Sequence, residues 1–183
     1  MPSTLPLNTC RWVQLWALCA LMLCGSPSQA QDTGMAPGER DLKVGFIYNF
    51  LRFTEWPEEV GSTLTLCIRG PDPFGVALDV LQGKPLGSRK LVVQRRGGES
   101  LKGCHAVFFS AEAASTQAKV LAELRGKPVL TMADSAGAAR QGVNLNMAVA
   151  QDKVTFEVNM QTARAAKLKL NPQMVHLATE VIE

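Results

Sequence analysis

The hydrophobic pattern separates a short apolar segment near the N-terminus from a longer part in which apolar and polar positions recur regularly. Residues 12–30 carry no charged side chain and follow Arg11, and the segment ends in Ser28-Gln29-Ala30, with small residues at the −3 and −1 positions of a peptidase site. This arrangement is typical of a signal peptide. We therefore expect residues 1–30 to direct export, with cleavage after Ala30 and a mature chain that works outside the cytoplasm.

Two other interpretations of this segment stay open. A transmembrane anchor would need about twenty apolar residues to cross the hydrocarbon core, and the apolar run from Trp12 to Cys24 is shorter. A lipoprotein acylated at Cys24 would have a small residue just before the cysteine, where this chain has Leu23. The cleaved signal peptide agrees best with the pattern.

The remaining part, residues 31–183, has the length of one domain and can bury a substantial core. Its first segment follows Pro37 and has apolar residues at the spacing of one helical face, namely Leu42, Phe46, Ile47, Phe50 and Phe53. The helix should end near Trp56, because Pro57 disfavours the helical conformation of the residue before it. We expect the aromatic stripe to belong to the core, the alternative being a ligand-binding site.

Apolar runs and helical patterns then alternate along the chain. Short continuous apolar runs predict strands at residues 64–69, 90–94, 105–109 and 128–132. Helical spacing is found at residues 74–81 and 112–125, and Ser110 can cap the second of these helices. Strands that alternate with helices of this length are typical of βαβ units and a parallel sheet.

The last third of the chain has a different pattern. Apolar and polar residues alternate strictly over residues 143–150 and 154–160, which predicts an antiparallel hairpin with one apolar and one polar face. A short helix is expected at residues 161–168. Asn171 and Pro172 should begin a final helix whose apolar face consists of Met174, Val175, Leu177, Ala178, Val181 and Ile182.

Together these elements predict an α/β fold with a single domain. Its mixed sheet would have a parallel centre flanked by helices and the antiparallel hairpin at one edge. The pattern contains no internal repeat, low-complexity segment or interdomain linker.

Charge and cysteine content narrow the class of protein. Removal of the signal peptide removes Arg11 and no acid, so the formal charge falls from +3 to +2, without any block of like sign that would indicate a nucleic-acid partner. Three of the five cysteines leave with the signal peptide, and only Cys67 and Cys104 remain. An even pair in an oxidising compartment predicts a disulfide, with two buried free thiols as the alternative.

The sequence contains no pattern of a known catalytic or cofactor site. Neither of the glycine-rich phosphate-binding patterns, Gly-x-Gly-x-x-Gly and Gly-x-x-x-x-Gly-Lys-Ser/Thr, occurs, and the Gly-x-Ser-x-Gly motif of serine hydrolases is also absent. Ser110 follows a strand as a nucleophile could, but its only candidate bases are His105 and His176, and no pair of residues has the spacing of metal ligands. We therefore expect neither an enzyme nor a metal or cofactor site.

Asp72 and Asp134 both follow predicted strands, at the edge where α/β sheets bind ligands. A small-ligand binding module that uses Asp72 and Ser110 is thus an alternative function. Both aspartates are more often turn or capping residues, and a hydrolase built on Ser110 is the weakest alternative.

Several motifs along the mature chain resemble those of the YfiR-like periplasmic proteins. They are Val44-Gly-Phe-Ile-Tyr-Asn-Phe50, Phe53-Thr-Glu-Trp-Pro57, Leu66-Cys-Ile-x-Gly70, Phe74-Gly75, Gly103-Cys-His-Ala-Val-Phe-Phe-Ser110, Pro128-Val-Leu-Thr131, Gly142-Val-Asn-Leu145, Val154-Thr-Phe-Glu-Val-Asn159 and Ala163-Arg-x-Ala-x-Leu-Lys-Leu170, followed by Leu177-Ala178. The correspondence runs in order over nearly the whole mature chain.

The resemblance implies a periplasmic regulator that restrains a membrane-bound diguanylate cyclase by contact with its periplasmic part, and hence a role in cyclic-di-GMP signalling. It also implies an outer-membrane, peptidoglycan-associated lipoprotein as a second partner, and a homodimer is a further alternative. The chain departs from the family in two places. It has no second cysteine pair after Cys104. Its C-terminal segment reads Leu168-Lys-Leu-Asn171, where the family has a partner-binding segment of the Leu-Lys-Ile-Ser type.

We expect a partner to dock on the hairpin and the segment that follows it. This surface would combine an apolar centre with a polar rim, formed by Glu157, Asn159, Arg164, Leu168, Leu170 and His176. The alternative is that Leu168 and Leu170 close the core.

Overall fold

The structure is a computed structural model that describes residues 35, 37–150 and 153–183. The expected signal peptide and its cleavage site lie outside the described residues. Among the described residues, no helix is both long enough and apolar enough to cross a membrane.

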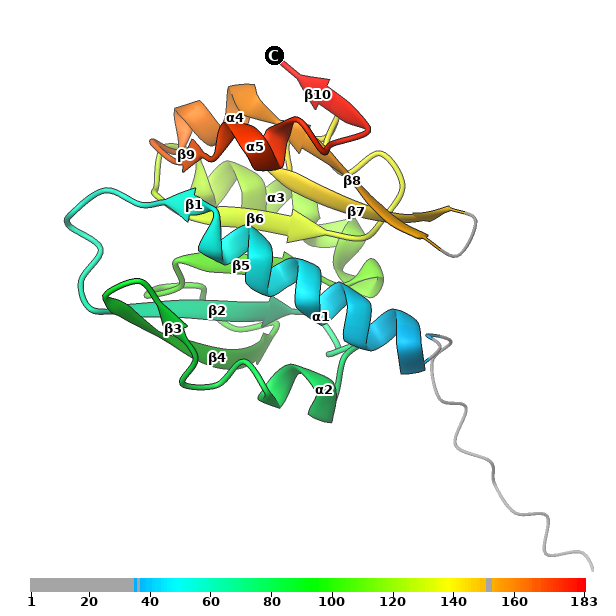
Figure 1. Ribbon diagram of the computed structural model, residues 1–183, viewed down its shortest axis with the longest axis horizontal. Coiled ribbons are helices and arrows are strands. Elements are labelled where there is room, and N and C mark those ends of the chain that lie inside the picture. Colours follow the sequence, from blue (N-terminus) through cyan, green and yellow to red (C-terminus); the bar gives the residue numbers. More distant parts are fainter. Residues whose placement is uncertain (1–34, 36, 151–152) are drawn as a thin grey trace, which may run out of the picture. The chain divides into compact units, whose positions relative to one another are not determined.

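A mixed sheet of eight strands organises residues 35–183 (Figure 1), in the order β10-β8-β7-β6-β5-β2-β4-β3. The strands β4, β2, β5, β6 and β7 run parallel to one another. The short edge strand β3 is antiparallel to β4, β7 and β8 form an antiparallel hairpin, and β10 runs parallel to β8. The strands are β2 (Thr63–Arg69), β3 (Pro85–Leu86), β4 (Arg89–Gly97), β5 (Ala106–Phe109), β6 (Leu130–Ala133), β7 (Leu145–Ala150), β8 (Lys153–Asn159) and β10 (Glu180–Ile182). A second, two-stranded sheet pairs β1 (Thr54–Glu55) with β9 (Lys169–Leu170).

Helices pack on both faces of the eight-stranded sheet. They are α1 (Pro37–Arg52), α2 (Val76–Asp79), the 3₁₀ turn η1 (Ala111–Ala113), α3 (Ala114–Leu124), α4 (Met160–Ala165) and α5 (Pro172–Val175). Figure 1 shows α1 across the near face of the sheet and α3 behind it.

The alternation of side chains along the strands divides the core into two parts, one on each face. On the α1 side, Leu66 and Phe108 pack with Ile47 and Phe50 of the helix. On the α3 side, Val107 and Phe109 pack with Val120 and Leu124. Both faces of the central strands are therefore buried, which explains why these strands are continuous apolar runs in the sequence.

The predicted fold class is confirmed: the protein has an α/β fold with a mixed sheet, a parallel centre, flanking helices and an antiparallel hairpin. The predicted disulfide is also present, between Cys67 of β2 and Cys104 just before β5, with Cα atoms 5.9 Å apart. Because β2 and β5 are neighbours in the sheet, the bond joins segments that the fold already holds together. It lies in the α3-side core.

The first helix is shorter than predicted and its apolar stripe is only partly buried. It ends at Arg52, because Thr54 and Glu55 instead pair with Leu170 and Lys169 as an antiparallel ladder. Ile47 and Phe50 are in the core as expected, whereas Leu42 and Phe53 are 45% and 37% exposed. The expectation that the whole stripe is core is wrong at its two ends.

The predicted final helix is also wrong beyond its first turn. Asn171 caps α5 as expected, its side chain accepting a hydrogen bond from the Gln173 amide. The helix stops at Val175, however, and residues 180–182 form β10 beside β8. The edge of β8 offers unpaired backbone groups, and pairing with it outweighs the helical pattern of this segment. The hairpin therefore lies one strand in from the edge.

Candidate functional site

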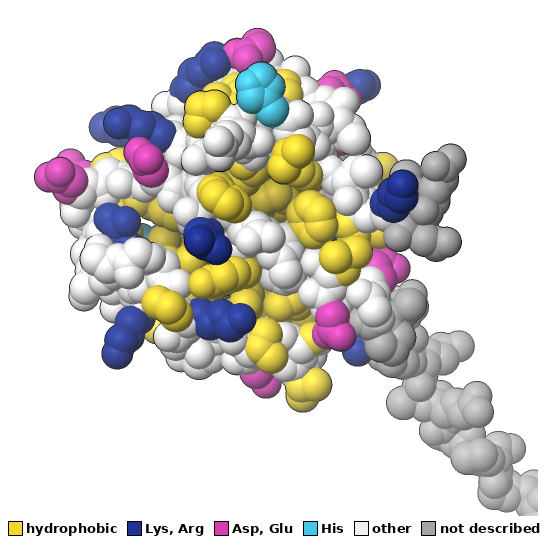
Figure 2. All heavy atoms as spheres, in the orientation of Figure 1, with side chains coloured by type: hydrophobic (Ala, Val, Ile, Leu, Met, Phe, Trp, Pro, Cys, Tyr) yellow, Lys and Arg dark blue, Asp and Glu magenta, His cyan; other side chains and the backbone are white. Residues whose placement is uncertain are grey.

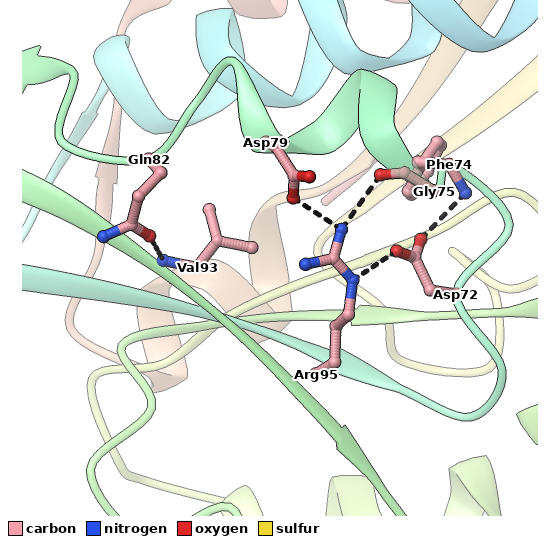
Figure 3. A network of polar contacts seen from close by, with 7 residues as sticks. All are labelled: Asp72, Phe74, Gly75, Asp79, Gln82, Val93 and Arg95. Atoms are coloured by element: carbon pink, nitrogen blue, oxygen red, sulfur yellow. Dashed lines mark hydrogen bonds and ion pairs between the residues drawn. The ribbon is translucent and has the colours of Figure 1, made fainter.

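The carboxylate of Asp72 is fully engaged in a local network at the end of β2 (Figure 3). Its Oδ1 accepts a hydrogen bond from the Phe74 amide at 2.8 Å, and its Oδ2 accepts one from Arg95 Nε at 2.6 Å. The Arg95 guanidinium also donates to Asp79 and to the Gly75 carbonyl. These hydrogen bonds to the two carboxylates raise the pKa of Arg95. Asp72 thus closes a turn and pairs with Arg95, which leaves it poorly suited to binding a ligand.

Asp134, at the end of β6, forms a buried ion pair with α1. Its Oδ2 lies 2.8 Å from Lys43 Nζ, which is also 2.9 Å from Glu39. Burial by itself lowers the pKa of Lys43, but hydrogen bonds and charge attraction from Asp134 and Glu39 outweigh it and raise that pKa. Asp134 Oδ1 is buried without a partner among the described residues. The pair fixes the start of α1 over the sheet.

Ser110 does not have the surroundings of a nucleophile. It directly precedes η1, but its side chain makes no capping hydrogen bond, and its Oγ is buried without a partner in the described part of the chain. His105 precedes β5 while Ser110 follows it, so the two lie at opposite ends of that strand, on the order of 15 Å apart. A Cβ on Gly70 would collide with Ser110 Oγ, so backbone closes over the hydroxyl.

His105 has a structural role at the start of β5. Its Nδ1 accepts a hydrogen bond from the Thr65 amide, and its carbonyl accepts one from Trp56 Nε1. Burial, with a smaller contribution from the charge of Arg89, lowers the pKa of His105. A neutral ring is required for the bond from Thr65, because a protonated imidazole has no acceptor nitrogen.

The six residues predicted to bind a partner do not form one surface. Asn159 is buried and caps α4, accepting from the Thr162 amide and donating to the Ala139 carbonyl. Glu157 is half-buried and accepts from Asn146. Arg164 is exposed and paired with Glu183, and His176 is exposed after α5.

Leu168 and Leu170 are only 4% and 7% exposed and belong to the α1-side core. The expectation that these two side chains form the exposed centre of an interface is therefore wrong, and the alternative that they close the core is correct. The physical reason is the pairing of β9 with β1, which folds this segment back under α1. A partner role for the exposed residues stays a prediction.

A different apolar surface is exposed along α1 and the hairpin, and we call it the α1–hairpin face. Figure 2 shows hydrophobic side chains gathered on this side of the molecule. The face is formed by Leu42, Phe46, Phe53, Val149 and Val154. Phe46 packs edge to face against Phe156, and Val154, two residues before Phe156 on β8, pairs with Val149 across the hairpin. Leu42 and Phe53 lie one and two turns from Phe46.

The sequence pattern does not reveal this face, because its residues belong to regular amphipathic patterns that also predict core. The only available signal was an excess of apolar residues, because the five positions of the stripe from Leu42 to Phe53 cover more surface than one helix face needs for packing. Among the described residues, no group of three His, Cys, Asp or Glu side chains could hold a metal ion.

These features are those of a small α/β protein with an exposed apolar face. Residues 40–179 match the model of the YfiR/HmsC-like family. The match covers well over half of the chain, and the chain belongs to this family. The family consists of periplasmic regulators that act with diguanylate cyclase signalling proteins, and it is regulatory rather than catalytic.

Proposed function

We propose that this protein is exported with cleavage after Ala30 and restrains a membrane-bound diguanylate cyclase by binding its periplasmic part. The α1–hairpin face carries the proposal. Soluble proteins seldom leave a contiguous group of large apolar side chains exposed without a binding role. Leu42 and Val149 are each 45% exposed, and the edge-to-face contact between Phe46 and Phe156 joins the helix to the hairpin within the face.

The α1–hairpin face is built in a way that suits a regulator that acts by binding its partner at a preformed surface. Phe46 and Phe156 are fixed by the buried ring of Phe50, whose centroid lies 5.9 Å from Phe46 and 5.1 Å from Phe156. A partner would therefore meet a preorganised apolar centre and lose little conformational entropy on binding. An outer-membrane, peptidoglycan-associated lipoprotein that binds the same face would release the cyclase.

The test is capture from a detergent extract of the organism's membranes by the mature chain, tagged at its N-terminus. We expect a protein with a diguanylate cyclase domain to co-purify with the wild type and not with Val149→Asp. The matched control is Val76→Asp, because Val76 is 84% exposed on α2 and is not one of the five residues that define the face. Both variants should fold normally, since exposed substitutions typically change stability by about 0.5 kcal/mol or less.

Cellular cyclic-di-GMP gives the functional measurement. Deletion of the gene should raise its level, and complementation with wild type or Val76→Asp, but not with Val149→Asp, should lower it again. Unchanged cyclic-di-GMP after deletion would contradict the regulatory function. Equal behaviour of the two Val→Asp variants would leave regulation intact but exclude the α1–hairpin face as its surface.

A further inference from the structure

A groove lies on the opposite side of the sheet, between α3 and α4, and we call it the α3–α4 groove. Its volume is about 500 Å³, which is within the range of small-molecule sites in proteins. Val129, Thr131 and Asn144 form its floor at the sheet, and its walls come from α3 and α4. It is separate from the α1–hairpin face and from Asp72 and Ser110, none of which line it.

Small side chains keep the groove open. Ala118 and Ala122 face it from successive turns of α3, and Ala165 and Ala166 face it from the end of α4. Gly142 lies on its edge with a φ of 105°, a conformation that favours glycine. Apolar contact is completed by Leu121, Leu124 and Val129. The walls therefore offer an apolar surface to the body of a ligand.

The polar groups of the floor already satisfy one another. Asn144 Oδ1 accepts hydrogen bonds from both the amide and the hydroxyl of Thr131, and Asn144 Nδ2 donates to Thr162 Oγ1 at 2.9 Å. The Thr162 hydroxyl in turn bonds to the carbonyl of Asn159. An apolar group can thus cover this floor without breaking a hydrogen bond, which would otherwise be costly.

One charge in the groove is not paired. Arg125 lines it directly after α3, and within the described part of the chain its guanidinium has no hydrogen bond or ion pair. The described lining also contains no Asp or Glu. By contrast, the arginines Arg95, Arg140 and Arg164 each pair with carboxylates of the chain. The groove therefore combines apolar walls with a single uncompensated positive charge.

We propose that the α3–α4 groove binds a small organic anion with an apolar body, and that Arg125 pairs with its carboxylate or a comparable anionic group. The site goes beyond the proposed partner binding and does not depend on it. Guanidinium groups bind carboxylates through two parallel N–H···O bonds, and small-molecule sites typically combine an apolar lining with a few polar groups that orient the ligand.

The test is a titration of isotope-labelled mature chain with decanoate, below its micelle concentration, followed by amide chemical shifts. We expect saturable shifts confined to α3, α4 and the floor of the groove. Decanol, which has the same chain without the charge, should bind more weakly. Arg125→Gln should lower the affinity for decanoate by about fivefold and leave the affinity for decanol unchanged. Lys127→Gln, which removes an exposed charge just outside the groove, should change neither affinity.

A second pair of variants tests the location. Ala118→Phe fills the groove and should weaken both probes by more than about tenfold. Ser115→Phe adds the same ring to an exposed position of α3 outside the groove and should weaken neither. Far-ultraviolet circular dichroism and thermal melting of each variant confirm that it is folded.

Several results would overturn the proposal. Shifts that gather on the α1–hairpin face, or an unchanged affinity in Ala118→Phe, would place the probe elsewhere. Equal affinity of Arg125→Gln and the wild type for decanoate would show that the Arg125 guanidinium does not pair with the carboxylate. A groove that binds neither probe, but is protected from hydrogen exchange in the complex with a captured protein, would be a protein-docking site instead.

Discussion

The two sides of the sheet are stabilised in different ways. On the α1 side, a large cluster of aliphatic and aromatic residues gathers around Phe50 and Leu66, and helices and the β1–β9 pair cover it. On the α3 side, the apolar cluster is smaller and contains the Cys67–Cys104 disulfide, and beside it lies the hydrogen-bonded group of Thr131 and Asn144. The comparison suggests that hydrophobic burial dominates on one side, while a covalent link and polar bonds compensate for a thinner core on the other.

The two sides also expose different surfaces for the same reason. The α1 side has more apolar residues than its core can enclose, so the remainder forms the α1–hairpin face. The α3 side has small residues where its two helices approach, so it is left with a groove. An apolar face suits a macromolecule and a groove suits a small molecule, which assigns the two binding proposals to opposite sides of one sheet.

The largest effect is expected in the α1-side core. Phe50 is 1% exposed and packs against both Phe46 and Phe156, so Phe50→Ala should lower the free energy of unfolding by about 3–5 kcal/mol. Urea denaturation measures this change. Phe53→Ala, at an exposed position directly after the same helix, is the matched control and should cost less than about 1 kcal/mol. Equal costs for the two variants would mean that the stripe is not divided into core and surface as the structure indicates.

The Cys67–Cys104 disulfide should stabilise the α3 side, as burial of Phe50 stabilises the α1 side. It closes a loop with a sequence separation of 37 residues, which corresponds to about 4 kcal/mol in the chain-entropy model. In the double variant Cys67→Ala/Cys104→Ala, the free energy of unfolding should fall by up to that amount. The rate of amide hydrogen exchange should increase more in α3 than in α1. Mass measurement after alkylation without reduction should find no labelled cysteine in the wild type, and two labelled thiols would contradict the bond.

The ion pair of Lys43 and Asp134 joins the start of α1 to the end of β6. Lys43→Met leaves the Asp134 carboxylate buried without its partner and should cost about 3 kcal/mol. Adding Asp134→Leu should recover most of the loss, because an apolar pair can replace a buried ion pair. Lys119→Met, on the exposed side of α3, should be nearly neutral. A small cost for Lys43→Met by itself would show that solvent reaches and satisfies the Asp134 carboxylate.

The smallest effect concerns pH. The pKa of His105 is lowered in the folded state, chiefly by burial, so the unfolded state binds a proton more readily and the folded state is favoured while His105 is neutral. This contribution should be complete above a pH of about 6.5, the ordinary histidine value, and should be lost as the pH falls through the lower folded pKa. Thermal melting between pH 7.5 and 5 should show a steeper decline in the wild type than in His105→Asn. If the melting temperatures of the two proteins fall in parallel with pH, protonation of His105 does not contribute to the pH dependence of stability.

The elements of the fold could be predicted from the sequence wherever one local pattern had one solution. The continuous apolar runs of β2, β5 and β6 and the strict alternation in β7 and β8 indicate, respectively, strands buried on both faces and a hairpin with one buried face. The cysteine pair could be predicted because its two members lie on or beside strands that a parallel sheet makes neighbours. These properties depend on side-chain chemistry and backbone sterics within a few residues.

The candidate surfaces could not be predicted in the same way. Leu168 and Leu170 have the apolar and polar neighbours of an interface, but the pairing of β9 with β1 buries them. Leu42 and Phe53 have the spacing of core residues, but no other element covers them and they are 45% and 37% exposed. Apolar character by itself cannot distinguish these cases, because the hydrophobic effect rewards burial without specifying a partner.

The sequence by itself thus determined the α/β class, the order of most strands and helices along the chain and the disulfide. The tertiary structure decided where α1 ends, that residues 180–182 form an edge strand, which leucines are buried and where the α1–hairpin face and the α3–α4 groove lie. The division has a physical reason. Periodicity and turn chemistry act within a few residues, whereas edge pairing and the exposure of a side chain depend on segments that are distant in the sequence, such as β8 with β10 and, more than a hundred residues apart, β1 with β9.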